Sequence, residues 1–314
     1  MAGPNSVAGH PNYSSDGAAK FIPAFWAGKM RTKFYRTTCF GEISNTDYEG
    51  IIAEQGDGVW IAGQPDLEIK DYSRGQDLDY ETPDSEATWL PIDKAKYFGF
   101  RVNDIDRYQS NHDLMDKFTD DAGRKMSIAI DRQMLGDVYT EVSPINAGNS
   151  AGKIQGDYEM GAPGAPKILT PDNILDFVVD MNSVLDEQDV DPQDRWIVLP
   201  TWATNMLKKS DLRNADAMGD SVSVIRNGRI GMIDQTTLYK SNNLSTVTDA
   251  DAGGQKATNI IFGHKSALTF ASQMTEMEEL PHPTKFGRLV RGLNVYGYKV
   301  INPDYMGHGY IAKA

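Results

Sequence analysis

Cysteine is nearly absent from this chain of 314 residues, which contains only Cys39. A single cysteine cannot form an intramolecular disulfide, and it cannot supply a zinc site built from several thiolates. Long apolar runs are absent too, because no stretch approaches the ~20 residues that a transmembrane helix requires. Residues 1–17 are rich in Gly, Ser, Asn and Pro and lack the apolar core of a signal peptide. We therefore expect a soluble protein made in a reducing cytoplasm.

Basic residues are in the minority: 31 Lys and Arg stand against 44 Asp and Glu, which gives a formal charge of −13 at pH 7. This balance argues against general nucleic-acid binding, which needs a basic face. Hydrophobic residues make up 40 % and charged residues 24 %, so the composition is that of a globular protein. The length favours two domains, or one domain with long extensions.

Signatures of catalysis are also lacking. The five histidines form no HxxxH or HExxH pair, so a helical metal site is not predicted. Residues 263–266 end like a phosphate-binding loop, but Thr258 stands where that loop needs its first glycine. Gly219-Asp220-Ser221 weakly resembles the nucleophile block of one esterase family, yet no block with a partner histidine is evident. We expect no enzyme activity, no metal and no cofactor, and keep an acidic α/β hydrolase using Ser221 as an alternative.

The region from Ile51 to Val102 carries short β-like runs separated by Gly, Asp and Pro. The runs are 59–61, 67–69, 89–92 and 97–100. The middle of the region is too polar to build a core, so it predicts a long two-stranded excursion. An isolated hairpin is marginal in water, so another surface must cover this one.

Apolar residues from Asn111 to Thr140 recur every three or four positions, which predicts a helix roughly 45 Å long. The stripe consists of Met115, Phe118, Ala122, Met126, Ile130, Met134 and Val138. A shorter helix is predicted around residues 25–35, and a glycine-rich linker over 147–167.

A second domain is predicted after the linker. Thr170-Pro171-Asp172 reads as a helix N-cap, followed by a buried stripe from Ile174 to Leu185. A buried strand is expected at 196–199, a helix at 201–213, and further strands around Leu238 and at 259–262. The tail from 273 to 310 is β-rich, with Tyr296, Tyr298 and Val300 on one face.

Charge is distributed unevenly along the chain. Residues 54–86 contain ten acids and two bases, whereas 18–40 contain five bases and 281–301 four bases, both without an acid. One interpretation is ordinary surface unevenness. The sharper one is complementary contact between copies of the chain, in which an acidic hairpin rests on a basic neighbour.

The order of these parts resembles the major capsid proteins of tailed bacteriophages. The segments that carry the resemblance are Phe21–Trp26, Phe40–Gly50, Asp57–Ala62, Trp196–Pro200 and Arg291–Val300. The resemblance implies an α+β fold with an N-terminal arm at 1–50 and an extended β-hairpin loop at 51–95. It places a peripheral domain at 96–167 and 271–314, with a long spine helix at 110–141, and an axial α/β domain at 168–270.

The resemblance also implies a function. The chain would be a structural subunit that self-assembles as pentamers and hexamers into an icosahedral capsid enclosing double-stranded DNA, without sequence-specific binding. Expected partners are other copies of the chain, a separate scaffolding protein, a portal protein and, as an open question, a decoration protein, with no membrane. The expected location is the virion, after assembly in the host cytoplasm.

The predicted contact residues between subunits combine the basic arm, the acidic loop and the basic tail segment. They are Lys29, Arg31, Lys33, Arg36, Trp60, Asp66, Glu68, Asp71, Asp77, Asp79, Glu81, Lys285, Arg288 and Arg291. Besides the hydrolase, two alternatives are the shell of a bacterial encapsulating nanocompartment and a sugar-binding tail or adhesion module.

Overall fold

A computed structural model describes most of the chain. The described residues are 38–48, 58–63, 67, 69–77, 80, 87–102, 114–210, 232–233, 235–249, 254, 256–284 and 287–314. The helix predicted around residues 25–35 and the Gly219–Ser221 block lie outside these ranges, so both stay predictions.

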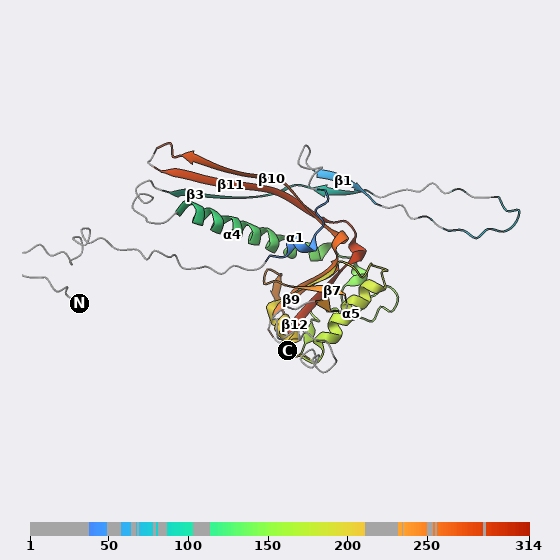
Figure 1. Cartoon of the computed structure of the whole chain (residues 1–314). Helices are drawn as coiled ribbons and strands as arrows, with labels where there is room; N and C mark the ends of the chain where they lie inside the picture. Colours follow the sequence, from blue (N-terminus) through green and yellow to red (C-terminus); the bar gives the residue numbers. More distant parts are fainter. Residues whose placement is uncertain are drawn as a thin grey trace, which may run out of the picture.

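One part of the molecule is a long antiparallel sheet with a helix running along it (Figure 1). Its strands are β10 (Leu268–Pro281), β11 (Arg288–Val300) and β3 (Lys94–Val102), with β11 in the middle. The helix is α4 (Leu114–Asp137), and a 3₁₀ turn at Val138–Glu141 continues it. The long helix that the apolar periodicity predicts over residues 111–140 is therefore confirmed at Leu114–Asp137.

Burial of α4 increases towards its C-terminal end. Ile130, Met134 and Val138 are buried, whereas Phe118 is 39 % exposed. The predicted tyrosine face of β11 is confirmed: the Tyr296 hydroxyl donates to Gln133 Oε1 at 3.0 Å, and the Tyr298 hydroxyl donates to Asp137. Two aromatic rings with hydrogen-bonded hydroxyls thus attach the sheet to the last turns of the helix.

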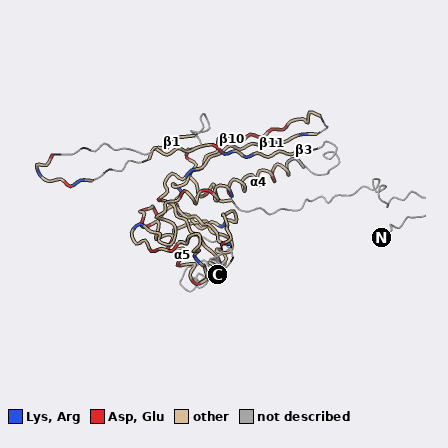
Figure 2. The backbone as a smooth tube through the Cα atoms, turned by 180° about the vertical axis from the view of Figure 1, so that it is seen from behind, with Lys and Arg blue, Asp and Glu red and all other residues tan. Residues whose placement is uncertain are grey.

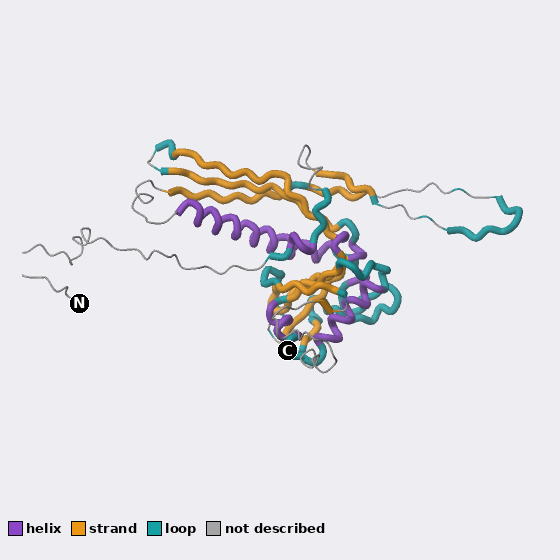
Figure 3. Tube along the Cα trace, viewed as in Figure 1, coloured by secondary structure: helices purple, strands orange, loops and turns teal. Residues whose placement is uncertain are grey.

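The other part is a seven-stranded mixed sheet with helices against it (Figure 3). Its strands are β4 (Lys167–Leu169), β5 (Arg195–Leu199), β6 (Met232–Ile233), β7 (Thr236–Lys240), β8 (Thr246–Thr248), β9 (Lys256–His264) and β12 (Met306–Lys313). The helices are α5 (Ile174–Asp186) and α6 (Thr201–Leu207). All five residues of β5 are buried, as its continuous apolar run predicts.

Three boundary predictions are wrong. Helix α5 begins at Ile174 after Asn173, because Asn173 Oδ1 accepts the Thr170 N–H at 2.7 Å and holds residues 170–173 in a turn. Helix α6 ends at Leu207, six residues before the predicted end at 213, and the chain turns at 208–210.

The third error concerns the C-terminal strand, because the predicted peripheral domain includes all of 271–314. Instead β12 pairs with β9 and β4 in the seven-stranded sheet. A 3₁₀ turn at Pro303–Tyr305 directs the chain out of the long sheet. Gly307 then lies beneath the Phe262 ring, which comes within 2.0 Å of where a Cβ would be, so this pairing needs a residue without a side chain.

The two parts and the start of the described chain meet at one buried carboxylate. Asp131, on α4, accepts the backbone N–H groups of Cys39 at 2.9 Å and Phe40 at 3.0 Å through Oδ1. Asn243 donates to its Oδ2 at 2.6 Å from the loop after β7. Asp131 therefore holds the entry of the short helix α1 (Phe40–Ile43), the spine helix and the seven-stranded part together. Burial, with Asp131 adding to it, raises the pKa of the Cys39 thiol, so that thiol stays protonated.

A histidine makes a second contact between the two parts. The His308 ring, on β12, stacks on Tyr139 with ring centroids 5.1 Å apart, and its Nε2 lies 3.0 Å from Asn259 Oδ1. Burial lowers the pKa of His308 to about 4, below its ordinary 6.5.

The His308 pKa predicts an acid-dependent loss of stability. Between pH 6.5 and about 4 the unfolded chain binds a proton that the folded chain does not, so stability is complete above pH 6.5 and falls as the pH decreases. Urea unfolding of unassembled subunits should show a loss of about 2–3 kcal/mol across this window. His308→Gln should remove that part of the pH dependence, and His282→Gln should keep it. Equal pH profiles for His308→Gln and the parent would contradict the assignment.

Candidate assembly interface

A two-stranded hairpin projects from the long sheet and is fixed to it at its root. Strand β1 (Gly58–Ala62) pairs antiparallel with β2 (Ala87–Pro91), as the sequence predicts. The root packs on its own chain through a small core of Ile61, Leu90, Ile92 and Ala271. The surface that the hairpin was expected to need is thus, for its root, the sheet of the same chain.

Beyond the root the projection is a loop that extends far from the rest of the molecule (Figures 1 and 3). The strand predicted at 67–69 does not form, because Leu67 and Ile69 have no strand pairing. The run 97–100 does form a strand, but it belongs to β3 in the long sheet.

Large apolar side chains are exposed along this projection. Trp60 is 67 % exposed, Ile69 93 %, Tyr72 65 % and Tyr80 85 %. Trp60 lies across the hairpin from Trp89, with ring centroids 5.0 Å apart. Exposed aromatic and aliphatic surface of this kind is typical of sites that contact a partner, and such a contact stays a prediction for this projection.

Charged residues gather at the tip of the loop (Figure 2). Of the predicted acidic contacts, Asp71 and Asp77 are exposed there, in the same described segment as Lys70 and Arg74. Asp66, Glu68, Asp79 and Glu81 lie outside the described residues, as do Lys29, Arg31, Lys33, Arg36 and Lys285.

The three described bases of the segment 281–301 each form an ion pair within their own chain. Arg288 pairs with Glu279, Arg291 with Glu278, and Lys299 with Glu141 at 3.0 Å. The first two pairs are not evident from the charge pattern, because the acids at 276–279 lie just before residues 281–301. The hairpin between β10 and β11 folds them back onto it, with Glu278 opposite Arg291. The arginines at 288 and 291 are therefore already neutralised within the chain.

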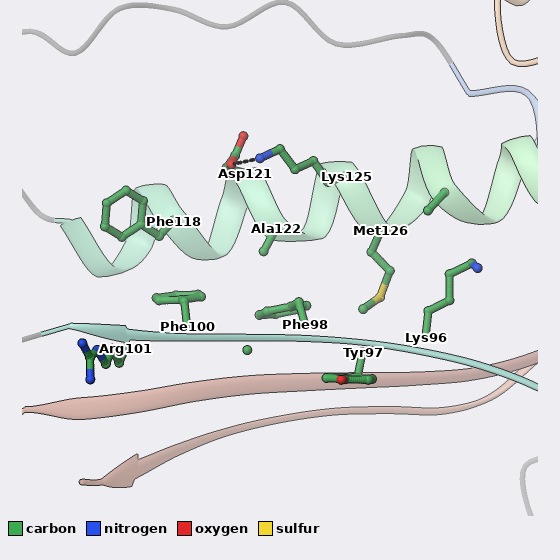
Figure 4. A pocket seen from close by; sticks show the side chains of 12 residues that line it. Lys96, Tyr97, Phe98, Phe100, Arg101, Phe118, Asp121, Ala122, Lys125 and Met126 are labelled. Atoms are coloured by element: carbon green, nitrogen blue, oxygen red, sulfur yellow. Dashed lines mark ion pairs between the residues drawn. The ribbon is translucent and has the colours of Figure 1, made fainter.

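A groove that the sequence analysis did not anticipate lies between β3 and α4 (Figure 4). Its volume is about 470 Å³. The floor is apolar: Phe98 and Phe100 point from the strand towards the helix, and Phe118 packs edge-on against Phe100 at 5.8 Å. Ala122 and Met126 complete it from α4. The alternation of residues 96–101 and the apolar stripe of the helix each predict an apolar face. Only the packing of β3 against α4 shows that a groove remains between the two faces.

The rim of this groove is mainly basic. Lys96 lines it from β3, whereas the Arg101 side chain lies on the side of that strand away from α4 (Figure 4). Lys125 lines it from α4, where it forms an ion pair of 2.8 Å with Asp121. Within the described part of the chain, Lys96 and Arg101 take part in no ion pair. The groove thus combines an aromatic floor with an excess of positive charge.

Neither a metal-binding cluster nor a membrane-spanning helix is found among the described residues. No group of three or more His, Cys, Asp or Glu there is arranged to hold a metal ion. In the same residues, no helix has the length and apolar character needed to cross a bilayer.

Comparisons with known proteins bear on the whole chain. No family model matches it, and no curated protein matches it. Among solved structures, a chain of Mycobacterium phage Che8 is 25 % identical, with 92 % of this chain and 96 % of that one aligned and a TM-score of 0.72. A chain from the capsid of cyanophage P-SCSP1u is 16 % identical, with 98 % of both chains aligned and a TM-score of 0.69. One from the capsid of a native GTA particle is 13 % identical, with coverages of 96 % and 99 % and a TM-score of 0.63. Near-complete coverage means that the entire fold is shared.

Proposed function

We propose that this chain, a structural capsid subunit with the fold of the tailed-phage major capsid proteins, forms pentamers and hexamers that close into an icosahedral shell around double-stranded DNA. The observation that carries the proposal is the shared fold, which spans both chains almost completely in each comparison. The chain's role is structural and non-enzymatic, and its place is the capsid of a virion. These neighbours do not favour the nanocompartment, hydrolase or adhesion alternatives.

The parts of the molecule take the following roles in this proposal. Residues 1–50 are the arm, 51–95 the extended loop, and 96–167 with the strands β10 and β11 the peripheral domain. The axial domain is 168–270, to which β12 adds its strand. The root of the extended loop is held by its own sheet, so the loop leaves each subunit in a set direction.

The energetics favour assembly through many modest contacts. A projection at one end of an elongated subunit that meets a different surface on the next copy makes a head-to-tail contact, and such contacts form a ring when the rotation between copies closes. Each exposed ion pair contributes only about 0–1 kcal/mol. Because every subunit makes several contacts at once, closure multiplies their effect.

The acidic composition suits a container for DNA. With a formal charge of −13, the chain offers little general attraction to phosphates, so packaged DNA is enclosed without being bound by sequence. A separate scaffolding protein and a portal protein are part of the proposal, with assembly in the host cytoplasm.

Electron microscopy of the purified protein tests the proposal directly. We expect closed particles of megadalton mass, formed alone or after co-expression with a scaffolding protein. Sedimentation of the same samples separates shells from small oligomers. Only small discrete oligomers under all conditions, with or without scaffold, would contradict a shell function.

A further inference from the structure

We propose that residues 38–45 act as a releasable strap that fixes the angle between the two parts of the molecule. One part is the long part, made of β3, β10, β11 and α4, and the other is the seven-stranded part. With the strap in place the two parts keep one relative orientation, and its release lets them turn. The inference concerns the single subunit, so it stands apart from the proposed shell function.

The chain crosses between the two parts at a narrow neck. Three crossings connect an element of one part to an element of the other, at 141–146, 264–268 and 300–306. They are hydrogen-bonded to one another: the Ile301 N–H donates to the Ala267 carbonyl at 2.8 Å, and the Ser143 N–H donates to the Pro303 carbonyl at 3.3 Å. Parts joined by neighbouring crossings turn about them unless further packing fixes the angle.

The strap supplies such packing in the joint. Figure 1 shows α1 at the place where the long part meets the seven-stranded part. Cys39, Ile43 and Ser44 are each at most 2 % exposed. Cys39 and Ile43 belong to the same apolar core as Ile130 of the long part and Leu244 of the seven-stranded part. Part of the core of the joint is therefore made by a segment that is none of the three crossings.

Two anchors hold the strap. The first is Asp131, which accepts the N–H groups of Cys39 and Phe40 from the strap and the Asn243 amide from the seven-stranded part. Because one carboxylate binds both, this anchor joins the strap to the two parts at once.

The second anchor is the start of strand β10. The Asn45 N–H donates to the Leu268 carbonyl at 2.8 Å, and the Asn45 carbonyl accepts the Phe270 N–H at 3.0 Å. The Phe40 ring lies against the Phe270 ring, with centroids 5.0 Å apart. Loss of this anchor leaves the strap attached at one end only, so we expect it to release.

The strap has the character of an element that opens locally. Helix α1 contains four residues, a single turn that is not stable by itself. Among the described residues, the only β-type pairing of the strap is the isolated bridge between Asn45 and Thr269. An element with so few backbone hydrogen bonds to its surroundings opens at a lower free energy than the sheets on either side. The strap therefore releases while both parts stay folded.

The reactivity of Cys39 reports whether the strap is in place. It is the only cysteine of the chain and is 2 % exposed, so the thiol reagent DTNB reaches it only after release. Asn45→Pro removes the N–H group that donates to Leu268, and Asn45→Ala is the matched control that keeps it. In unassembled subunits, Cys39 should react at least tenfold faster in Asn45→Pro than in the parent or in Asn45→Ala.

The angle of the joint is measured by electron paramagnetic resonance between two spin labels. Tyr97→Cys on β3 and Val247→Cys on β8 carry the labels, because these side chains are 83 % and 49 % exposed. Cys39→Ser removes the native thiol and keeps a donor for Asp131. The distance distribution should be narrow in this labelled parent and with Asn45→Ala, and broad with Asn45→Pro. Circular dichroism of the same samples checks that the sheets remain folded.

The two measurements together decide the inference. Fast reaction of Cys39 with a broad distance distribution supports the strap. Fast reaction with a narrow distribution means that the angle is fixed without the strap, and overturns it. Slow reaction in Asn45→Pro also overturns it, because the pairing with β10 then does not hold the strap. If Asn45→Pro does not fold, Phe40→Ala, which removes only the ring against Phe270, replaces it with the same readings. None of these results depends on whether shells form, so the shell function is tested separately.

Discussion

Asp131→Ala is expected to lower the free energy of unfolding by roughly 3–5 kcal/mol. The substitution removes both carboxylate oxygens from a fully buried site. These oxygens accept hydrogen bonds from three N–H donors, those of Cys39, Phe40 and the Asn243 amide, and from the weaker Cys39 thiol. Each buried donor that loses its partner costs about 1–3 kcal/mol. These donors belong to the start of α1 and to the seven-stranded part, so the loss also uncouples three segments of the chain. Urea unfolding of the unassembled subunit measures the effect.

Two further variants test whether the loss of unfolding free energy comes from the buried carboxylate of Asp131. Asp120→Ala removes an exposed carboxylate from the same helix, where it pairs with Arg124, and should change stability by no more than about 1 kcal/mol. Asp131→Asn keeps the shape of the side chain but turns an amide N–H group towards one of the three N–H donors. Its loss of unfolding free energy should therefore lie between those of Asp131→Ala and Asp120→Ala. A loss below about 1 kcal/mol for Asp131→Ala would mean that the carboxylate does not hold the segments together.

Local patterns predicted the elements that bury a regular face. The helical stripe from Ile130 to Val138, the apolar run of β5 and the alternation of Tyr296 with Tyr298 each identify one element and its buried side. These signals are local because burial repeats with the period of the element itself. The same reasoning failed at Thr170, where an asparagine three residues later holds the backbone in a turn and delays the helix.

Contacts between distant segments could not be read in this way. The pairing of β12 with β9 joins residues 43 (Met306 and Gly263) to 53 (Ile311 and Thr258) positions apart, and nothing in the sequence of β12 identifies the strand with which it pairs. The in-chain ion-pair partners of the basic tail segment are hidden in the sequence for the same reason. A count along the chain found no acid in 281–301, but the β10–β11 register places Glu278 beside Arg291. The groove likewise arises from packing, because neither the sequence of β3 nor that of α4 predicts a gap between the two elements.

Gly297→Ala is expected to abolish assembly while the rest of the subunit stays folded. Gly297 lies on β11 beneath the root of the projecting hairpin, where an added Cβ would come within 2.0 Å of the Pro91 carbonyl oxygen and 3.0 Å of Ile92 Cα. Both contacts are with backbone atoms, which cannot rotate away as a side chain can. The root must therefore lift off the sheet, and the small core of Ile61, Leu90 and Ala271 opens. Overpacking of this kind costs about 1–3 kcal/mol.

The effect on assembly should exceed the effect on stability, because the sheet beneath the root sets the direction in which the loop leaves the subunit. A loop whose direction is no longer fixed must lose conformational entropy each time it binds a neighbouring subunit. This free-energy cost applies at every contact in a ring. Gly99→Ala is the matched control: it adds the same methyl group to the same sheet, where the nearest heavy atom is 3.9 Å away. Sedimentation should find shells for Gly99→Ala and a loss of at least tenfold for Gly297→Ala. Limited proteolysis should cut the hairpin root faster only in Gly297→Ala. Shells in normal yield from Gly297→Ala would show that the sheet does not set the loop's direction.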